Sequence, residues 1–116
     1  MQLTNISPRT CTIFGYAGVQ LLRADGSRVP TDIVRDHSRA PHLVTLRHGQ
    51  RASASWHWSV IAESGETSTG TCEPITATIK ITPPDATTSL RIRWAYGPVC
   101  EHGQIVERPF SGPYQA

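Results

Sequence analysis

The chain has 116 residues, of which 38% are hydrophobic and 17% charged, and its formal net charge is +2. This length fits one domain, and the composition differs from that of highly charged, disordered chains. The 11 basic residues are scattered along the chain, whereas nucleic-acid binding requires a clustered basic patch. We therefore expect a single domain over residues 1–116, with an ordered core over about 3–109 and a tail at 110–116, and no nucleic-acid partner.

Neither a membrane span nor a signal peptide is predicted. No apolar run reaches the roughly 18 residues that a transmembrane helix needs. The first eight residues lack the basic and apolar regions of a signal peptide. We therefore expect no membrane-spanning segment and no signal peptide in this chain.

Short β-strands are predicted in chain order from alternating polar and apolar residues. They cover residues 2–6, 11–14, 19–22, 42–47, 51–60, 75–83, 89–96 and 104–108. Residues 28–29 follow an Asp-Gly turn and begin a returning strand. The polar segment 31–41 is predicted to be a loop that contains at most a helical turn.

Three of these strands show which residues should face the core. The clearest alternation places on one face Ala52, Ala54, Trp56, Trp58 and Val60. In the strand at 75–83, the side chains expected to point inward are those of Ile75, Ala77, Ile79 and Ile81. In the strand at 89–96, one face is expected to carry Leu90, Ile92, Trp94 and Tyr96.

About seven short strands without an amphipathic helix predict an all-β fold. Alternation with one wet face is typical of antiparallel sheets, and two such sheets packed face to face form a β-sandwich. We predict an antiparallel β-sandwich, with a closed barrel as the alternative.

The cysteines Cys11, Cys72 and Cys100 are widely spaced and form no Cys-x-x-Cys pair, which is typical of disulfides rather than of zinc sites. A Cys72–Cys100 disulfide would close a loop of about 28 residues and stabilise the fold by roughly 3–4 kcal/mol. In that pairing Cys11 is left over. Pairing of Cys11 with Cys72 or with Cys100 is the alternative.

Several short motifs, in order, resemble the domain of unknown function 4232 family, whose members are mostly secreted proteins and lipoproteins of actinobacteria. The resemblance covers roughly residues 3–112. The matching motifs are Leu3-Thr4-Asn5, the run from Cys11 to Val19, Asp25-Gly26, Val44-Thr45-Leu46 with Gly49 and Ala52, Trp56 or Trp58, Cys72, the run from Ile79 to Pro84, and Val99-Cys100 with Gly103.

The resemblance implies an immunoglobulin-like sandwich in the cell envelope or medium, and it implies no activity. The chain departs from the family at Ala17, where a proline is common, and it lacks an additional N-terminal strand with a fourth cysteine. In the family, that cysteine is expected to pair with Cys11. The resemblance therefore implies a Cys72–Cys100 disulfide and leaves Cys11 as an unpaired or intermolecular thiol.

We expect no metal, cofactor or catalytic residues. The histidines His37, His42, His48, His57 and His102 are interpreted as exposed residues without ligand spacing. The chain contains no Gly-x-Ser-x-Gly elbow. The carboxylates that are expected in loops, and so form no catalytic pair, are Asp32, Asp36, Glu63, Glu66 and Glu73.

The aromatic residues divide into core and surface. The three tryptophans are expected in the core, whereas Phe14 and Tyr16 at the Gly15–Gly18 corner are candidate exposed contacts. Without the family's first strand, one sheet edge is expected to lie open, so a homodimer through that edge or through Cys11 is a further hypothesis.

We therefore predict a non-catalytic β-sandwich module, secreted or in the cell envelope, with a binding or structural role toward an unknown protein or envelope ligand. The alternative is a small secreted hydrolase with an unrecognised site.

Overall fold

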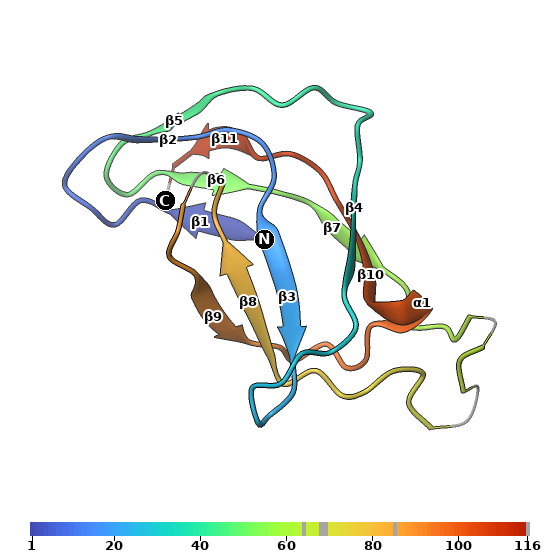
Figure 1. The fold of residues 1–116 in the computed structure, drawn as a ribbon. Coiled ribbons are helices and arrows are strands. Elements are labelled where there is room, and N and C mark those ends of the chain that lie inside the picture. Colours follow the sequence, from blue (N-terminus) through green and yellow to red (C-terminus); the bar gives the residue numbers. More distant parts are fainter. Residues whose placement is uncertain (64, 68–69, 85, 116) are drawn as a thin grey trace.

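The computed structural model describes residues 1–63, 65–67, 70–84 and 86–115. Its described part consists of short strands and one tight turn, connected by long loops (Figure 1). The elements are β1 (Gln2–Thr4), β2 (Cys11–Ile13), β3 (Gly18–Leu22), β4 (Asp32–Arg35), β5 (Val44–Leu46), β6 (Arg51–Ser53), β7 (Trp56–Trp58), β8 (Thr78–Thr82), β9 (Leu90–Arg93), α1 (Cys100–Gly103), β10 (Gln104–Glu107) and β11 (Ser111–Tyr114).

The strands form small sheets in the orders β1-β6-β11, β4-β10-β7, β2-β5 and β3-β8-β9. The first two sheets share one layer because β6 runs on into β7, and β10 into β11 (Figure 1). The β3-β8-β9 sheet forms the facing layer. None of these sheets closes on itself, so the predicted all-β sandwich is confirmed rather than the barrel.

The core lies between the layers and joins residues far apart in the chain. Leu21 and Ile79 come from the β3-β8-β9 sheet, and Ile105 and Phe110 from the opposite layer; all four are at most 2% exposed. Alternation in β8 places Ile79 and Ile81 inward, as predicted, because successive side chains of a strand point to opposite faces.

The segment 31–41 was predicted to be a loop, and this is wrong for Asp32–Arg35. These residues form β4, which pairs in parallel with β10, Asp32 opposite Gln104 and Arg35 opposite Glu107. The pairing is long-range and the strand is mostly exposed, so its own residues carry no alternating pattern. It is also the one parallel pair among the described strands of this otherwise antiparallel fold.

The predicted tail at 110–116 is also wrong. Phe110 is fully buried, and its N–H donates to the Gly15 carbonyl at 2.9 Å. Ser111–Tyr114 follows as β11 and pairs with β6. The prolines and glycine around this strand are typical of loops, and only its position at a sheet edge allows them.

Two alternating runs are shorter than predicted. The strand at 51–60 is divided into β6 and β7, and Val60 is 66% exposed. The strand at 75–83 begins only at Thr78; before it, Ile75 is 64% exposed and Thr76 is buried. Both predicted strands therefore extend beyond the residues that form strands in the structure.

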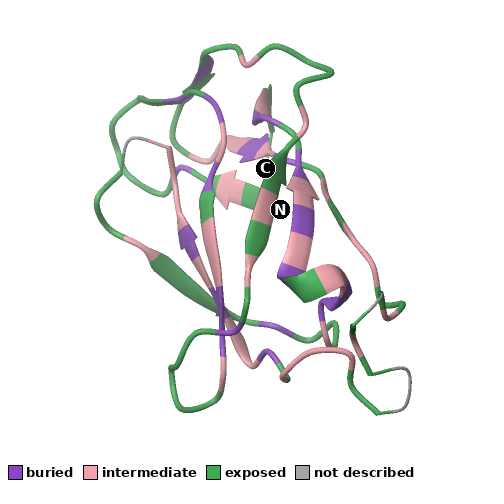
Figure 2. Cartoon of the chain, turned by 45° about the vertical axis from the view of Figure 1, so that its right-hand side comes forward, coloured by how far each residue is buried: buried purple, intermediate pink, exposed green. Residues whose placement is uncertain are grey.

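The strand at 89–96 is shorter too, since β9 ends at Arg93, and it is exposed along its length (Figure 2). Leu90 and Ile92 are about half exposed, although the pattern predicted that they face the core. The described residues place no strand beyond β9, so these side chains lie at an uncovered edge.

Candidate functional site

A disulfide brings distant acidic residues and a histidine together beside α1. Cys72 and Cys100 are bonded with their Cα atoms 5.6 Å apart, which confirms this predicted pair. The bond places Glu73, directly after Cys72, near His102, two positions after Cys100. Glu66, from the loop before Cys72, completes the group, which we call the Glu–His cluster: Glu66, Glu73 and His102.

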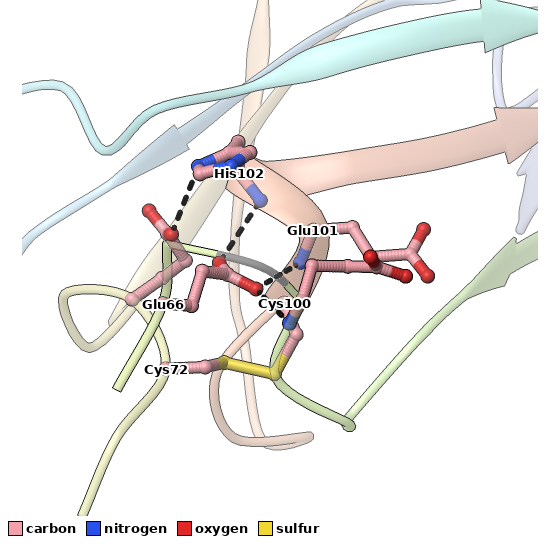
Figure 3. Close-up of polar contacts among 7 residues, drawn as sticks. Glu66, Cys72, Cys100, Glu101 and His102 are labelled. Carbon is pink, nitrogen blue, oxygen red and sulfur yellow. Dashed lines mark hydrogen bonds and ion pairs between the residues drawn. A yellow bond between two sulfur atoms is a disulfide. The ribbon is translucent and has the colours of Figure 1, made fainter. Parts of the chain in front are cut away.

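Glu66 holds the backbone of α1 in place. Its carboxylate accepts hydrogen bonds from the backbone N–H groups of Glu101, at 2.9 Å, and His102, at 3.0 Å (Figure 3). Both residues have left-handed backbone angles, φ +56° for Glu101 and +58° for His102, which cost on the order of 1–3 kcal/mol each outside glycine. The carboxylate of Glu66 therefore compensates part of the strain of this turn.

The two carboxyl groups of the cluster have pKa values that are shifted in opposite directions. The hydrogen bond with Glu73 lowers the pKa of Glu66 to about 2. The same hydrogen bond, followed by burial and the charge of Glu66, raises the pKa of Glu73. His102 Nδ1 lies 3.5 Å from Glu73 Oε2, and its charge, when protonated, favours the ionised form of that carboxyl.

The cluster has the ligand types of a divalent-cation site. Its three residues each offer one ligand atom, and these atoms lie within 4.8 Å of one another. Sequence reasoning missed the cluster because Glu66 and His102 are separated by 36 residues. The available signal was a glutamate directly after Cys72 and a histidine two positions after Cys100, once these cysteines are paired.

A second feature is an apolar groove between the two layers, with a cavity volume of about 280 Å³. We call it the aromatic groove and define it by Trp56, Trp58, Ile92, Trp94 and Tyr96. The ring centroids of Trp58, Trp94 and Tyr96 lie 5.0–5.7 Å apart, within the range of favourable aromatic pairs.

The tryptophans are less buried than predicted. Trp94 is buried, as expected, and its indole N–H donates to the Gly97 carbonyl at 2.8 Å. Trp56 and Trp58 are only half-buried, because the layers do not close over them. Tyr96, predicted to share the inward face, is 66% exposed at the rim of the groove.

The other predicted site residues lie apart from both features. Cys11, in β2, is an exposed free cysteine. Phe14 is 50% exposed, whereas Tyr16 is half-buried and donates from its hydroxyl to the Asp36 carbonyl at 2.8 Å. Tyr16 thus ties the corner to the end of β4, where Arg35 lies over its ring at 5.1 Å. Dimerisation through Cys11 stays a prediction.

Histidine contacts give no support to nucleophilic catalysis. Among the described residues, the hydrogen bonds recorded for histidine rings outside the Glu–His cluster join His37 to the Tyr16 hydroxyl and His48 to the Ser7 carbonyl. Neither contact involves a serine or threonine hydroxyl or a cysteine thiol, since Ser7 takes part through its backbone carbonyl.

The model of the family described as "Domain of unknown function (DUF4232)" matches residues 1–111. No curated protein and no solved structure matches the chain. No helix of the described residues is long and apolar enough to cross a membrane.

Proposed function

The chain belongs to the family of the domain of unknown function DUF4232, and we propose that it acts outside the cytoplasm as a non-catalytic binding module. The aromatic groove carries this proposal. It leaves Trp58 half-buried and Tyr96 66% exposed in a concave, apolar site. Concave sites lined by aromatic side chains are the usual form of ligand-binding sites.

The disulfide supports a location outside the cytoplasm. Cytosolic thiols are kept reduced, so a structural disulfide such as Cys72–Cys100 is typical of secreted and envelope proteins.

We expect cell fractionation of the source organism to find the protein in the envelope or the medium, with Cys72 and Cys100 oxidised. Peptide mapping after alkylation without reductant measures the state of both thiols. Exposed Cys11 serves as the internal control, because it is free and should be alkylated. A cytoplasmic protein with Cys72 and Cys100 both alkylated would contradict the proposed location.

Binding at the groove is tested with the apolar fluorescent probe 1-anilinonaphthalene-8-sulfonate. We expect Tyr96→Ser to weaken probe binding about fivefold, since an aromatic contact contributes on the order of 1 kcal/mol beyond its buried area. Tyr114→Ser is the matched control, because Tyr114 is also exposed but lies on β11, outside the groove. Equal loss in both variants, or no binding to the native chain, would argue against the groove as a binding site.

A further inference from the structure

The edge strand β9 has unused backbone hydrogen-bonding groups. The Trp94 N–H, directly after β9, donates to the Ala77 carbonyl at 3.0 Å. In an antiparallel ladder, every second residue of a strand directs its N–H and C=O groups toward the same neighbour. Trp94 directs its N–H toward the β8 side, so the N–H and C=O groups of Arg91 and Arg93 point away from β8. No backbone partner is recorded for them in the described part of the chain. The edge therefore has the groups that a further strand requires.

One face of β9 is apolar and borders the opening between the layers. Leu90 and Ile92 are 50% and 52% exposed, although Ile79, opposite Ile92, is buried. Ile92 lines the aromatic groove, and Leu90 lines a neighbouring cavity of about 350 Å³ whose other wall includes Leu3 of β1. A strand added along β9 would cover both side chains and would extend over both cavities.

The other face of β9 is cationic. Arg91 and Arg93 alternate with the apolar residues and are exposed, although Arg93 also lines the aromatic groove; Lys80 pairs with Arg91 across the ladder. Arg28, Lys80 and Arg91 line a polar hollow of about 280 Å³ on this outer face. No ion pair is recorded for these four cations among the described residues. The face thus complements negative charge.

This charge distribution decides which strand fits the edge. A second copy paired two-fold and antiparallel through β9 would place arginines of one copy opposite arginines of the other, and like charges directly opposite are destabilising. An extended segment with acidic residues at alternate positions would instead meet Arg91 and Arg93, and its apolar residues would cover Leu90 and Ile92.

We infer that β9 is a docking edge for an extended segment of another protein, in which acidic and apolar residues alternate. The segment joins the β3-β8-β9 sheet as an added antiparallel strand, a recognised mode of peptide binding. This inference rests on the proposed binding function and names the chemistry of the partner.

The test uses the full chain and an end-blocked heptapeptide in which valine alternates with glutamate, titrated by tryptophan fluorescence. A second peptide carries lysine in place of glutamate. We expect the acidic peptide to bind at least tenfold more tightly than the basic one. Arg91→Pro is expected to abolish binding, because proline removes an N–H that points to the docking strand and is tolerated at a sheet edge.

A double variant shows whether the charges of Arg91 and Arg93 contribute to binding, without the risk that proline disturbs the fold. The double variant Arg91→Gln/Arg93→Gln is expected to bind the acidic peptide about tenfold more weakly than the native chain. The matched surface variant Arg9→Gln/Arg47→Gln is expected to change this affinity less than twofold. Equal affinity for the two peptides, or no binding while the apolar fluorescent probe still binds the groove, overturns the docking edge and leaves the proposed binding function standing. A dimer in light scattering that Arg91→Pro converts to a monomer would overturn it in favour of a second copy.

Discussion

Replacing Phe110 by alanine is expected to lower the free energy of unfolding by about 3–5 kcal/mol, the usual loss for a buried phenylalanine. The ring of Phe110 is fully buried in the core between the layers. Phe110 lies between the end of β10 and the start of β11, so removal of its ring leaves a cavity beside both strands. Urea unfolding at neutral pH, followed by circular dichroism, measures the loss.

Phe14→Ala is the matched control for this experiment. The substitution removes the same atoms, but Phe14 is 50% exposed at the corner, so we expect a loss below about 1 kcal/mol. A similar small loss in both variants would mean that residues 110–116 behave as the tail that the sequence pattern predicted.

The sequence predicted those parts of the fold that local alternation determines. β5 and β8 lie within predicted strands, β3 begins one residue before its predicted strand, and Ile79 and Ile81 face the core as the pattern required. The Cys72–Cys100 pair was predicted as well, with other pairings left open by the residues alone. In each case the information lies in a few neighbouring residues or in a residue type with a restricted chemistry.

The remaining elements depend on contacts between distant segments. β4 is a strand because β10 lies beside it, about 70 residues later in the chain. Residues of β11 carry loop-forming glycine and proline, yet pairing with β6 holds them extended. Local propensity cannot report such long-range pairing, and a mostly exposed strand lacks the alternation that would reveal it.

The candidate sites were predicted less well than the fold. The tryptophans were assigned to the core, since an apolar face normally lies against another sheet. The structure instead pairs β9 with β8 on one side only, with no strand on its other side in the described residues, and the aromatic groove opens there. The Glu–His cluster depends on a disulfide and on loop geometry, neither of which a strand pattern contains.

Glu107 could not be identified from the sequence either, because charged residues are normally exposed. Its side chain is fully buried on β10, and neither carboxyl oxygen has a hydrogen-bond partner among the described residues. Burial raises its pKa to about 7, while Arg35 and the nearby indole N–H of Trp56 act in the opposite direction. The Trp56 N–H is itself unpaired, so the two groups lie close without forming a hydrogen bond.

This buried carboxyl makes stability depend on pH in a defined direction. The folded pKa of about 7 lies above the ordinary value of 4.5, so the folded state keeps the proton that the unfolded state releases. The contribution of the protonated Glu107 carboxyl to stability is therefore fully present below about pH 4.5 and is lost as the pH rises through 7. At about 1.4 kcal/mol per pH unit, the loss amounts to about 3 kcal/mol above pH 7.

Glu107→Gln is expected to recover this loss. The glutamine has nearly the same shape and stays neutral, so the variant should be about 3 kcal/mol more stable than the native chain at pH 8 and nearly equal to it at pH 4. Urea unfolding of both proteins at the two pH values measures the difference. Comparing the two chains at each pH cancels the titration of all other groups, because these are shared.

A surface substitution on the neighbouring strand completes the design. Asp32→Asn removes one negative charge from exposed β4, and we expect it to change stability by less than about 0.5 kcal/mol at either pH. An equal effect of Glu107→Gln at pH 4 and pH 8 would show that packing of the amide, rather than ionisation of the carboxyl, determines the change. A stability gain of Glu107→Gln that is confined to high pH would instead show that the native chain loses stability by burying the ionised Glu107 carboxylate between β4 and β7. Arg35, which lies opposite Glu107 on β4, is too exposed to compensate this loss fully.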